Sequence, residues 1–143
     1  MKPREGVLSI TYCYTTTNGE VTITDCSTDG FEELVIPDTI EGNPVTSIGN
    51  SAFKRCKSLR SITIPDSITS IGNSAFSVCA SLTSITIPDS VTSIGDWAFN
   101  KCSSLTSMTI GNGVTSIGDY AFRDCTSLTS FTAPDGVHQD HYW

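Results

Sequence analysis

The sequence predicts a β-rich solenoid, coiled in a right-handed sense, with parallel strands on one face and short helical turns on the other. Two observations carry this prediction. The dipeptide Ala-Phe recurs every 23 residues, and a cysteine follows each copy at the same offset; the repeated residues are Phe53, Phe76, Phe99 and Phe122, with Cys56, Cys79, Cys102 and Cys125. Self-similarity at a fixed period of this length is typical of a solenoid, in which each repeat is one turn stacked on the last.

The repeat that begins at Leu59 shows how its strand forms. Its opening Leu-x-x-Ile-x-Ile pattern has the spacing of a leucine-rich repeat strand. Alternation places Ile62 and Ile64 inward and the hydroxyl side chains between them toward solvent. Because Pro65 has no backbone N–H to donate to a ladder, we expect the strand to end there.

The second half of the same repeat predicts a short helical turn. Gly72 permits a sharp bend, and the side chain of Asn73 can cap a helix N-terminus. Ala75, Phe76 and Cys79 would then share one face of that turn. No single repeat can bury its inward residues alone, so we expect stability to come from the stacking of neighbouring turns.

The chain divides into three segments. An Asn18–Gly19 pair between alternating runs at residues 7–14 and 21–25 predicts a hairpin. The first full repeat is longer than the others, and its extra residues predict a loop at 41–44. We therefore expect a β-hairpin cap at the N-terminus, a solenoid of four to five turns, and a C-terminal tail or partial cap; their ranges are 1–30, 31–135 and 136–143.

Charge and hydropathy exclude several classes of partner. The net charge is −7, whereas nucleic acids and anionic membranes require clustered Lys and Arg. One repeat does carry such a cluster, but no later repeat renews it, so we interpret it as a solvated face; its members are Lys54, Arg55, Lys57 and Arg60. No stretch has the roughly 20 apolar residues of a membrane span, and the N-terminus lacks the pattern of a signal peptide. We expect neither nucleic-acid binding nor membrane insertion.

The cysteines favour structural roles over catalysis or metal binding. The four repeated cysteines would point the same way into the core, which predicts a buried ladder of free thiols. A single row of this kind cannot surround zinc tetrahedrally. Cys13 and Cys26 differ, because they fall on one face of the predicted hairpin, where a disulfide between them is an alternative to free thiols.

The histidines and carboxylates also favour a protein without catalytic or metal sites. His138 and His141 lie in the last six residues, so no interior histidine can serve a nucleophile. One carboxylate follows most of the predicted strands; the row is Asp38, Asp66, Asp89 and Asp135, interrupted by Asn112. Such a row could hold calcium. We interpret these residues instead as ordinary turn residues. We expect no enzyme activity, no cofactor and no metal.

The solvent side of the strands, here called the strand face, is the first candidate binding surface. It carries two columns of hydroxyl groups and an edge column; these are Ser61, Ser84, Ser107 and Ser130, then Thr63, Thr86, Thr109 and Thr132, and at the edge Arg60, Thr83, Thr106 and Thr129. About five strands of this kind span on the order of 250 Å². A standard interface buries about 800 Å² per partner. We therefore expect this face to bind a protein or glycan weakly or multivalently.

Two further candidates involve aromatic residues. Trp97 and Tyr120 precede Ala-Phe in adjacent repeats and should be neighbours. They form either an exposed contact patch or a pair that packs over the adjoining turn. At the C-terminus the apolar edge of the last strand must be covered. Tyr142 and Trp143 could fold over this edge, or a second molecule could stack on it.

The repeated motif is similar to that of a known family. Ala-Phe-x-x-Cys-x-Ser-Leu-x-Ser-Ile-Thr-Ile-Pro-Asp-Ser-Val-Thr-Ser-Ile-Gly, present almost verbatim at residues 75–95, resembles the BspA-like leucine-rich repeats. The resemblance covers about residues 31–135 and implies a leucine-rich-repeat coil, an extracellular or cell-surface location, and adhesion or protein binding without catalytic residues. We therefore predict a non-enzymatic interaction or adhesion module. The alternative is a structural protein that assembles end to end into fibres or a surface layer, because heterologous stacking gives open filaments.

Overall fold

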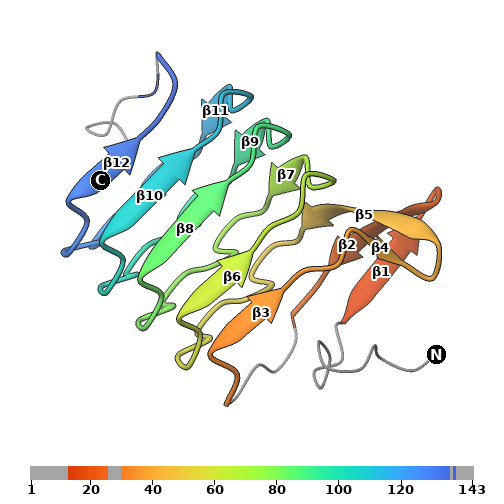
Figure 1. The fold of residues 1–143 in the computed structure, drawn as a ribbon, viewed down its shortest axis with the longest axis horizontal. Coiled ribbons are helices and arrows are strands. Elements are labelled where there is room, and N and C mark those ends of the chain that lie inside the picture. The colour runs from red at the N-terminus through yellow and green to blue at the C-terminus, as the bar shows by residue number, and fades with distance from the viewer. Residues whose placement is uncertain (1–12, 26–29, 136, 138–143) are drawn as a thin grey trace.

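The computed structural model describes residues 13–25, 30–135 and 137. Within these residues the chain forms a short solenoid of stacked turns, which confirms the predicted architecture (Figure 1). The strands are β1 Tyr14–Thr17, β2 Glu20–Ile23, β3 Glu33–Val35, β4 Thr39–Ile40, β5 Asn43–Ile48, β6 Ser61–Thr63, β7 Ser70–Ile71, β8 Ser84–Ile87, β9 Ser93–Ile94, β10 Ser107–Ile110, β11 Ser116–Ile117 and β12 Ser130–Thr132.

The strand face consists of two groups of parallel strands. β3 pairs with β6, while β8, β10 and β12 form a separate three-stranded ladder. Figure 1 shows all five strands side by side along one face of the solenoid. Apolar side chains alternate inward as predicted, so Ile85 and Ile87 of β8 are buried whereas Ser84 and Thr86 are exposed.

A second parallel sheet runs along another face, and the sequence pattern does not predict it. Its strands β5, β7, β9 and β11 pair in that order, in register 23 residues apart. The pattern identifies Ile68 and Ile71 only as inward-facing residues. The segment Ser70–Ile71 is too short for an alternation signal, and it becomes a strand because the equivalent segments of neighbouring turns bond to it.

The N-terminal hairpin is confirmed, with different bounds. β1 and β2 pair antiparallel around Asn18 and Gly19, whose φ angles are 54° and 78°. β1 occupies residues 14–17 rather than 7–14, and residues 1–12 lie outside the described part of the chain. β2 then pairs in parallel with β5, so the hairpin extends the second sheet.

The predicted loop at 41–44 is the turn of a second, shorter hairpin. β4 pairs antiparallel with β5 across Glu41 and Gly42. Both residues have positive φ angles, 52° and 83°. Two consecutive left-handed residues are characteristic of the tight turns that join antiparallel strands. The extra length of the first repeat is therefore used to build a hairpin.

The predicted helical turns are wrong: the described residues contain no helix. A helix needs backbone N–H groups to bond four residues back, but here they are divided between local turns and the next repeat. The N–H of Cys56 donates to the carbonyl of Phe53 at 3.3 Å, whereas that of Phe53 donates to Ala75 in the following turn at 2.7 Å. Ser51 and Arg55, with φ angles of 59° and 63°, reset the chain direction on either side.

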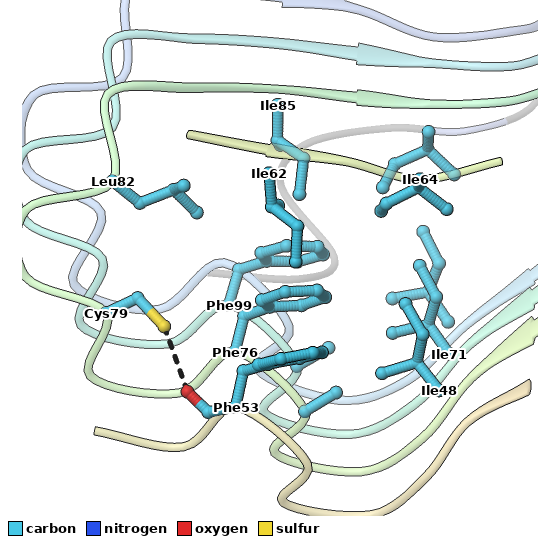
Figure 2. Close-up of a cluster of buried hydrophobic side chains, with 14 of the residues drawn as sticks. Ile48, Phe53, Ile62, Ile64, Ile71, Phe76, Cys79, Leu82, Ile85 and Phe99 are labelled. Carbon is cyan, nitrogen blue, oxygen red and sulfur yellow. Dashed lines mark hydrogen bonds between the residues drawn. The ribbon is translucent and has the colours of Figure 1, made fainter. Parts of the chain in front are cut away.

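The core is a stack of phenylalanines along the solenoid axis. The ring centroids of Phe53 and Phe76 are 5.4 Å apart, those of Phe76 and Phe99 are 5.2 Å apart, and Phe122 follows at 6.1 Å. All four side chains are fully buried. Figure 2 shows three of these rings one above another, with the isoleucines of the two sheets beside them. Stacking between turns therefore supplies the core, as the repeat pattern predicts.

The predicted ladder of buried free thiols is confirmed beside this stack. The four repeated cysteines are buried and form no disulfide. Each of the last three donates its Sγ–H to the carbonyl of a phenylalanine 26 residues earlier; for Cys79 and Phe53 the distance is 3.1 Å (Figure 2). The contact with the Cys56 thiol, and then burial, raise the pKa of Cys79 above its ordinary value. The thiol therefore stays protonated at neutral pH and packs as a small apolar group.

Candidate functional site

The structure brings the two predicted hydroxyl columns together on the strand face. Ser84 and Ser130 flank Ser107 in register, and Thr86 and Thr132 flank Thr109 in the same way. The threonines of this second column are exposed, as is Thr63 on β6. Among the described residues, none of these hydroxyl groups has a hydrogen-bond partner in the fold. They are therefore available to a ligand.

The N-terminal end of the strand face is less uniform. Glu33 lies in register with Ser61, and Val35 lies in register with Thr63. Val35 is 51% exposed, which makes it an apolar surface residue in the threonine column. The sequence offers a signal for it, because alternation around the inward Leu34 and Ile36 places Val35 outward. The predicted face does not include this residue.

The edge column differs from the other two and has a structural role. The Oγ1 atoms of its threonines donate to carbonyl oxygens of the preceding turn, over distances of 3.4, 3.1 and 3.4 Å; the donors are Thr83, Thr106 and Thr129, and the acceptors are Arg60, Thr83 and Thr106. Their hydroxyl protons are therefore used between turns. The column thus offers a ligand mainly the exposed side chain of Arg60 at its start.

A shallow groove of about 560 Å³ opens on the strand face between β6 and β8. These strands do not share a ladder, and the N–H of Thr83 reaches the carbonyl of Arg60 at 3.1 Å just before they begin. The groove is lined by the outward hydroxyl groups of both strands, by parts of the inward isoleucines, and by Asp66 and Asp89 at its end. It gives the predicted binding face a concave region.

The aromatic pair lies at the turn corner of the solenoid. The ring centroids of Trp97 and Tyr120 are 4.7 Å apart, with an angle of 34° between their planes. The guanidinium of Arg123 lies 5.1 Å from the centre of the Tyr120 ring. Trp97 is 38% exposed and Tyr120 is 41% exposed. The rings thus pack across adjacent turns and still present surface to solvent, while the contact patch itself stays a prediction.

Several candidate residues fall outside the described part of the chain. These are His138, His141, Tyr142, Trp143 and Cys26. Cys13 is disulfide-bonded, which is the alternative that the sequence left open for it, and its pairing with Cys26 lies outside the described residues. Within residues 13–25, 30–135 and 137, no group of three or more His, Cys, Asp or Glu residues could hold a metal ion. Nor does that part of the chain contain a helix long and apolar enough to cross a membrane.

One member of the predicted carboxylate row accepts a backbone hydrogen bond and so supports a turn. The Oδ1 atom of Asp89 accepts a hydrogen bond from the backbone N–H of Asn112 at 2.8 Å, one turn further along the chain. Gly113 lies against the same segment, where an added Cβ would overlap the carbonyl oxygen of Asp89. The carboxylate thus supports a close crossing of two turns.

Comparisons with known proteins agree with this architecture. The family model described as the BspA type leucine rich repeat region matches residues 25–140 in six copies. Solved structures similar to this chain include a leucine-rich repeat protein from Bacteroides capillosus ATCC 29799, at 31% identity and a TM-score of 0.76, over 85% of this chain and 93% of the other. The leucine rich repeat protein of T. pallidum gives 31% identity and a TM-score of 0.71, over 84% and 67% respectively.

A third similar structure is a leucine rich cell surface protein from Faecalibacterium prausnitzii A2-165. It is 33% identical with a TM-score of 0.69, and the match covers 96% of this chain but 44% of the other. The chain therefore spans less than half the length of that protein. No curated protein sequence matches the chain.

Proposed function

This chain belongs to the BspA-type leucine-rich repeat family, and from that premise we propose that it is a non-enzymatic adhesion module which binds a protein through its strand face. The fold and the similar cell-surface protein support an interaction module at a cell surface. The disulfide at Cys13 agrees with an oxidising location of that kind.

The observation that carries the proposal is the uneven use of hydroxyl groups. Directly before the strands β7, β9 and β11 of the second sheet, Thr69, Thr92 and Thr115 each donate Oγ1 to a carbonyl of the preceding turn at 3.2 Å. On the strand face, the two hydroxyl columns have no such partner among the described residues. The strand face therefore carries two aligned columns of hydroxyl groups that the fold leaves unused.

The groove between β6 and β8 favours an extended peptide segment as the part of the partner that is bound. It offers hydroxyl groups at its rims, which can donate to and accept from a peptide backbone, and apolar atoms at its floor. The small size of the face predicts weak binding by one copy. Longer arrays or several copies would then be needed for firm adhesion.

A peptide selection with a matched pair of variants tests the proposal. Peptides are selected from a displayed random library on the full chain, and the Kd of the best peptide is measured by calorimetry for wild type, Ser84→Arg and Ser103→Arg. Ser84 lies at the groove, and its column tolerates charge because Glu33 occupies it in register with Ser61. Ser103 is an exposed serine outside the strand face. Lys57 occupies the equivalent position two turns earlier, so this position accepts a long charged side chain.

We expect Ser84→Arg to weaken binding about tenfold or more, because a long charged side chain would obstruct the groove. Ser103→Arg should bind the peptide as wild type does. Equal affinity of all three proteins would place the binding surface elsewhere and contradict the proposal.

End-to-end assembly is the second candidate function, and the last strand favours it. β12 has a ladder partner, β10, on one side among the described residues. Phe131 on β12 is half-buried, and its ring packs edge-on against Phe122 at 5.3 Å. Light scattering on a size-exclusion column, over about a hundredfold range of concentration under reducing conditions, tests this candidate by mass action. Assembly predicts growth into larger species, whereas a monomer throughout the range excludes it.

A further inference from the structure

Trp97 and Tyr120, here called the aromatic corner, differ in residue type from the rest of their column in the repeats. Ser51 and Ser74 occupy the same column in the two preceding turns, and all four residues of the column have φ angles between 58° and 61°. Serine therefore suffices to build this corner. Bulky side chains are rarely found in the left-handed region, so Trp97 and Tyr120 are held there at a conformational cost that the fold does not require. Such exceptions point to function.

The two rings pack across adjacent turns, with one face of the Trp97 indole against Tyr120. Trp97 and Tyr120 are equivalent residues of successive turns, and their centroid separation of 4.7 Å is close to the strand spacing of about 4.8 Å. The rings therefore lie one above the other along the solenoid axis. The other face of the indole does not contact Tyr120, and the same column in the preceding turn holds the small side chain of Ser74. Because Trp97 is 38% exposed, its indole presents apolar surface to solvent.

A groove of about 370 Å³ with a partly polar lining lies near this corner and is lined by residues of four successive turns. Its lining includes Asn73 and Asp96, and Asp96 immediately precedes Trp97, which places their Cα atoms about 3.8 Å apart. Gly95, which also lines the groove, packs closely against the preceding turn, since an added Cβ would overlap Oδ1 of Asn73. The lining also includes the hydroxyl groups of Ser70, Ser93 and Ser116 and the apolar side chains of Ile71, Ile94 and Ile117.

The hydrogen-bonding groups of the groove include both donors and acceptors. The Oδ1 atoms of Asn50 and Asn73 accept backbone N–H groups at 2.8 Å, which leaves their amide NH₂ groups as donors toward solvent. The Oδ1 atom of Asp96 accepts from Asp119 at 2.8 Å, which leaves Oδ2 as an acceptor. Carboxylates at this corner oppose an anionic ligand.

We propose that this corner binds a neutral oligosaccharide, with one hexopyranose ring stacked on the free face of Trp97 and neighbouring hydroxyl groups in the polar groove. The C–H face of a pyranose carries a partial positive charge that suits the negative face of the indole. Its hydroxyl groups both donate and accept, as the groove requires. This site lies away from the strand face and takes a different class of ligand, so it goes beyond the proposed function.

The fluorescence of Trp97 gives a direct measurement. The chain has two tryptophans, Trp97 and Trp143, so Trp143→Phe leaves Trp97 as the single reporter. Cello-, malto-, manno- and chito-oligosaccharides are titrated into this protein. We expect at least one to change its emission saturably, and Tyr120→Ser to weaken that binding about tenfold, because the indole loses its supporting ring. By calorimetry, Trp97→Ser should abolish binding.

Two controls show whether a loss of binding is specific to the aromatic corner. The serine variants restore the residue that the preceding turns already carry, so they should fold, which circular dichroism verifies. Val35→Ser removes an exposed apolar side chain from the strand face and should leave oligosaccharide binding unchanged. Ser84→Arg, which tests the proposed peptide site, should also leave it unchanged, so either proposal can fail without the other.

Three results would overturn the proposal. The first is that none of the four oligosaccharide classes changes the fluorescence or releases heat at saturating concentrations. The second is that binding survives Trp97→Ser, which would place the sugar elsewhere. The third is that Trp97→Ser alters the oligomeric state in light scattering without any sugar binding by wild type, which would assign the aromatic corner to contact between copies of the chain.

Discussion

Individual side-chain oxygens connect each turn of this solenoid to the next. Asn50, Asn73 and Asp96 each accept a backbone N–H from the residue 23 positions later, always at 2.8 Å. The sequence predicts that Asn73 caps a helix within its own turn. The residue type is correctly interpreted as an acceptor for a backbone N–H, but the donor comes from the neighbouring turn, which local sequence does not reveal.

Replacement of Asn73 tests this role. Asn73→Ala leaves the N–H of Asp96 without its acceptor and should lower the free energy of unfolding by about 1 kcal/mol, as for the loss of a helix cap. Asn73→Asp should retain most of the stability, because aspartate already accepts the same kind of hydrogen bond at Asp96. Urea denaturation of the three proteins measures the differences. Equal losses for Ala and Asp would refute the role of the side-chain oxygen.

On the candidate binding face too, local sequence does not reveal which side chains bond to a neighbouring turn. Alternation correctly places Ser84 and Thr86 outward, because burial follows a period of two along a strand. It cannot separate these residues from Thr83, which is also polar and lies next to them. Thr83 donates to a carbonyl of the preceding turn, and that bond depends on the spacing of turns rather than on residue type.

At the scale of elements, hydrogen bonding between turns overrides local patterns. Ala-Phe-x-x-Cys has the spacing of a helix face, yet every second N–H of the segment from Ser51 to Arg55 bonds to the next turn. Likewise β7, β9 and β11 have two residues each and exist because equivalent segments lie side by side. The period of 23 residues predicts the stack reliably. It does not specify which backbone groups join its turns.

The second hairpin offers a test at this scale. Gly42 has a φ angle of 83°, and an added Cβ would meet no atom within 4 Å. Gly42→Ala should therefore destabilise the protein by about 1 kcal/mol through backbone conformation alone. Gly42→Asn should cost less, because asparagine tolerates the left-handed region better. Thermal unfolding measures both variants, and no loss for Ala would show that the turn does not hold this conformation.

At the scale of the whole molecule, the N-terminal end of the stack is closed by the hairpin, since Val21 and Ile23 of β2 are fully buried and β2 bonds to β5. Each turn contacts its neighbours, so turns can be added without altering those already present. The match covers 44% of the Faecalibacterium prausnitzii protein, which is therefore longer than this chain. The weak binding expected of one short face is therefore compatible with adhesion by longer or repeated arrays.

Chemical-shift mapping by NMR tests the central claim most directly, because it locates a bound ligand on the whole chain at once. The ¹⁵N-labelled full chain is titrated to saturation with the selected peptide. The account predicts that the largest shifts fall on β6, β8 and β10, around Thr63, Thr86 and Thr109. Largest shifts at the turn corner around Trp97, or at Tyr142 and Trp143, would contradict the assignment of protein binding to the strand face.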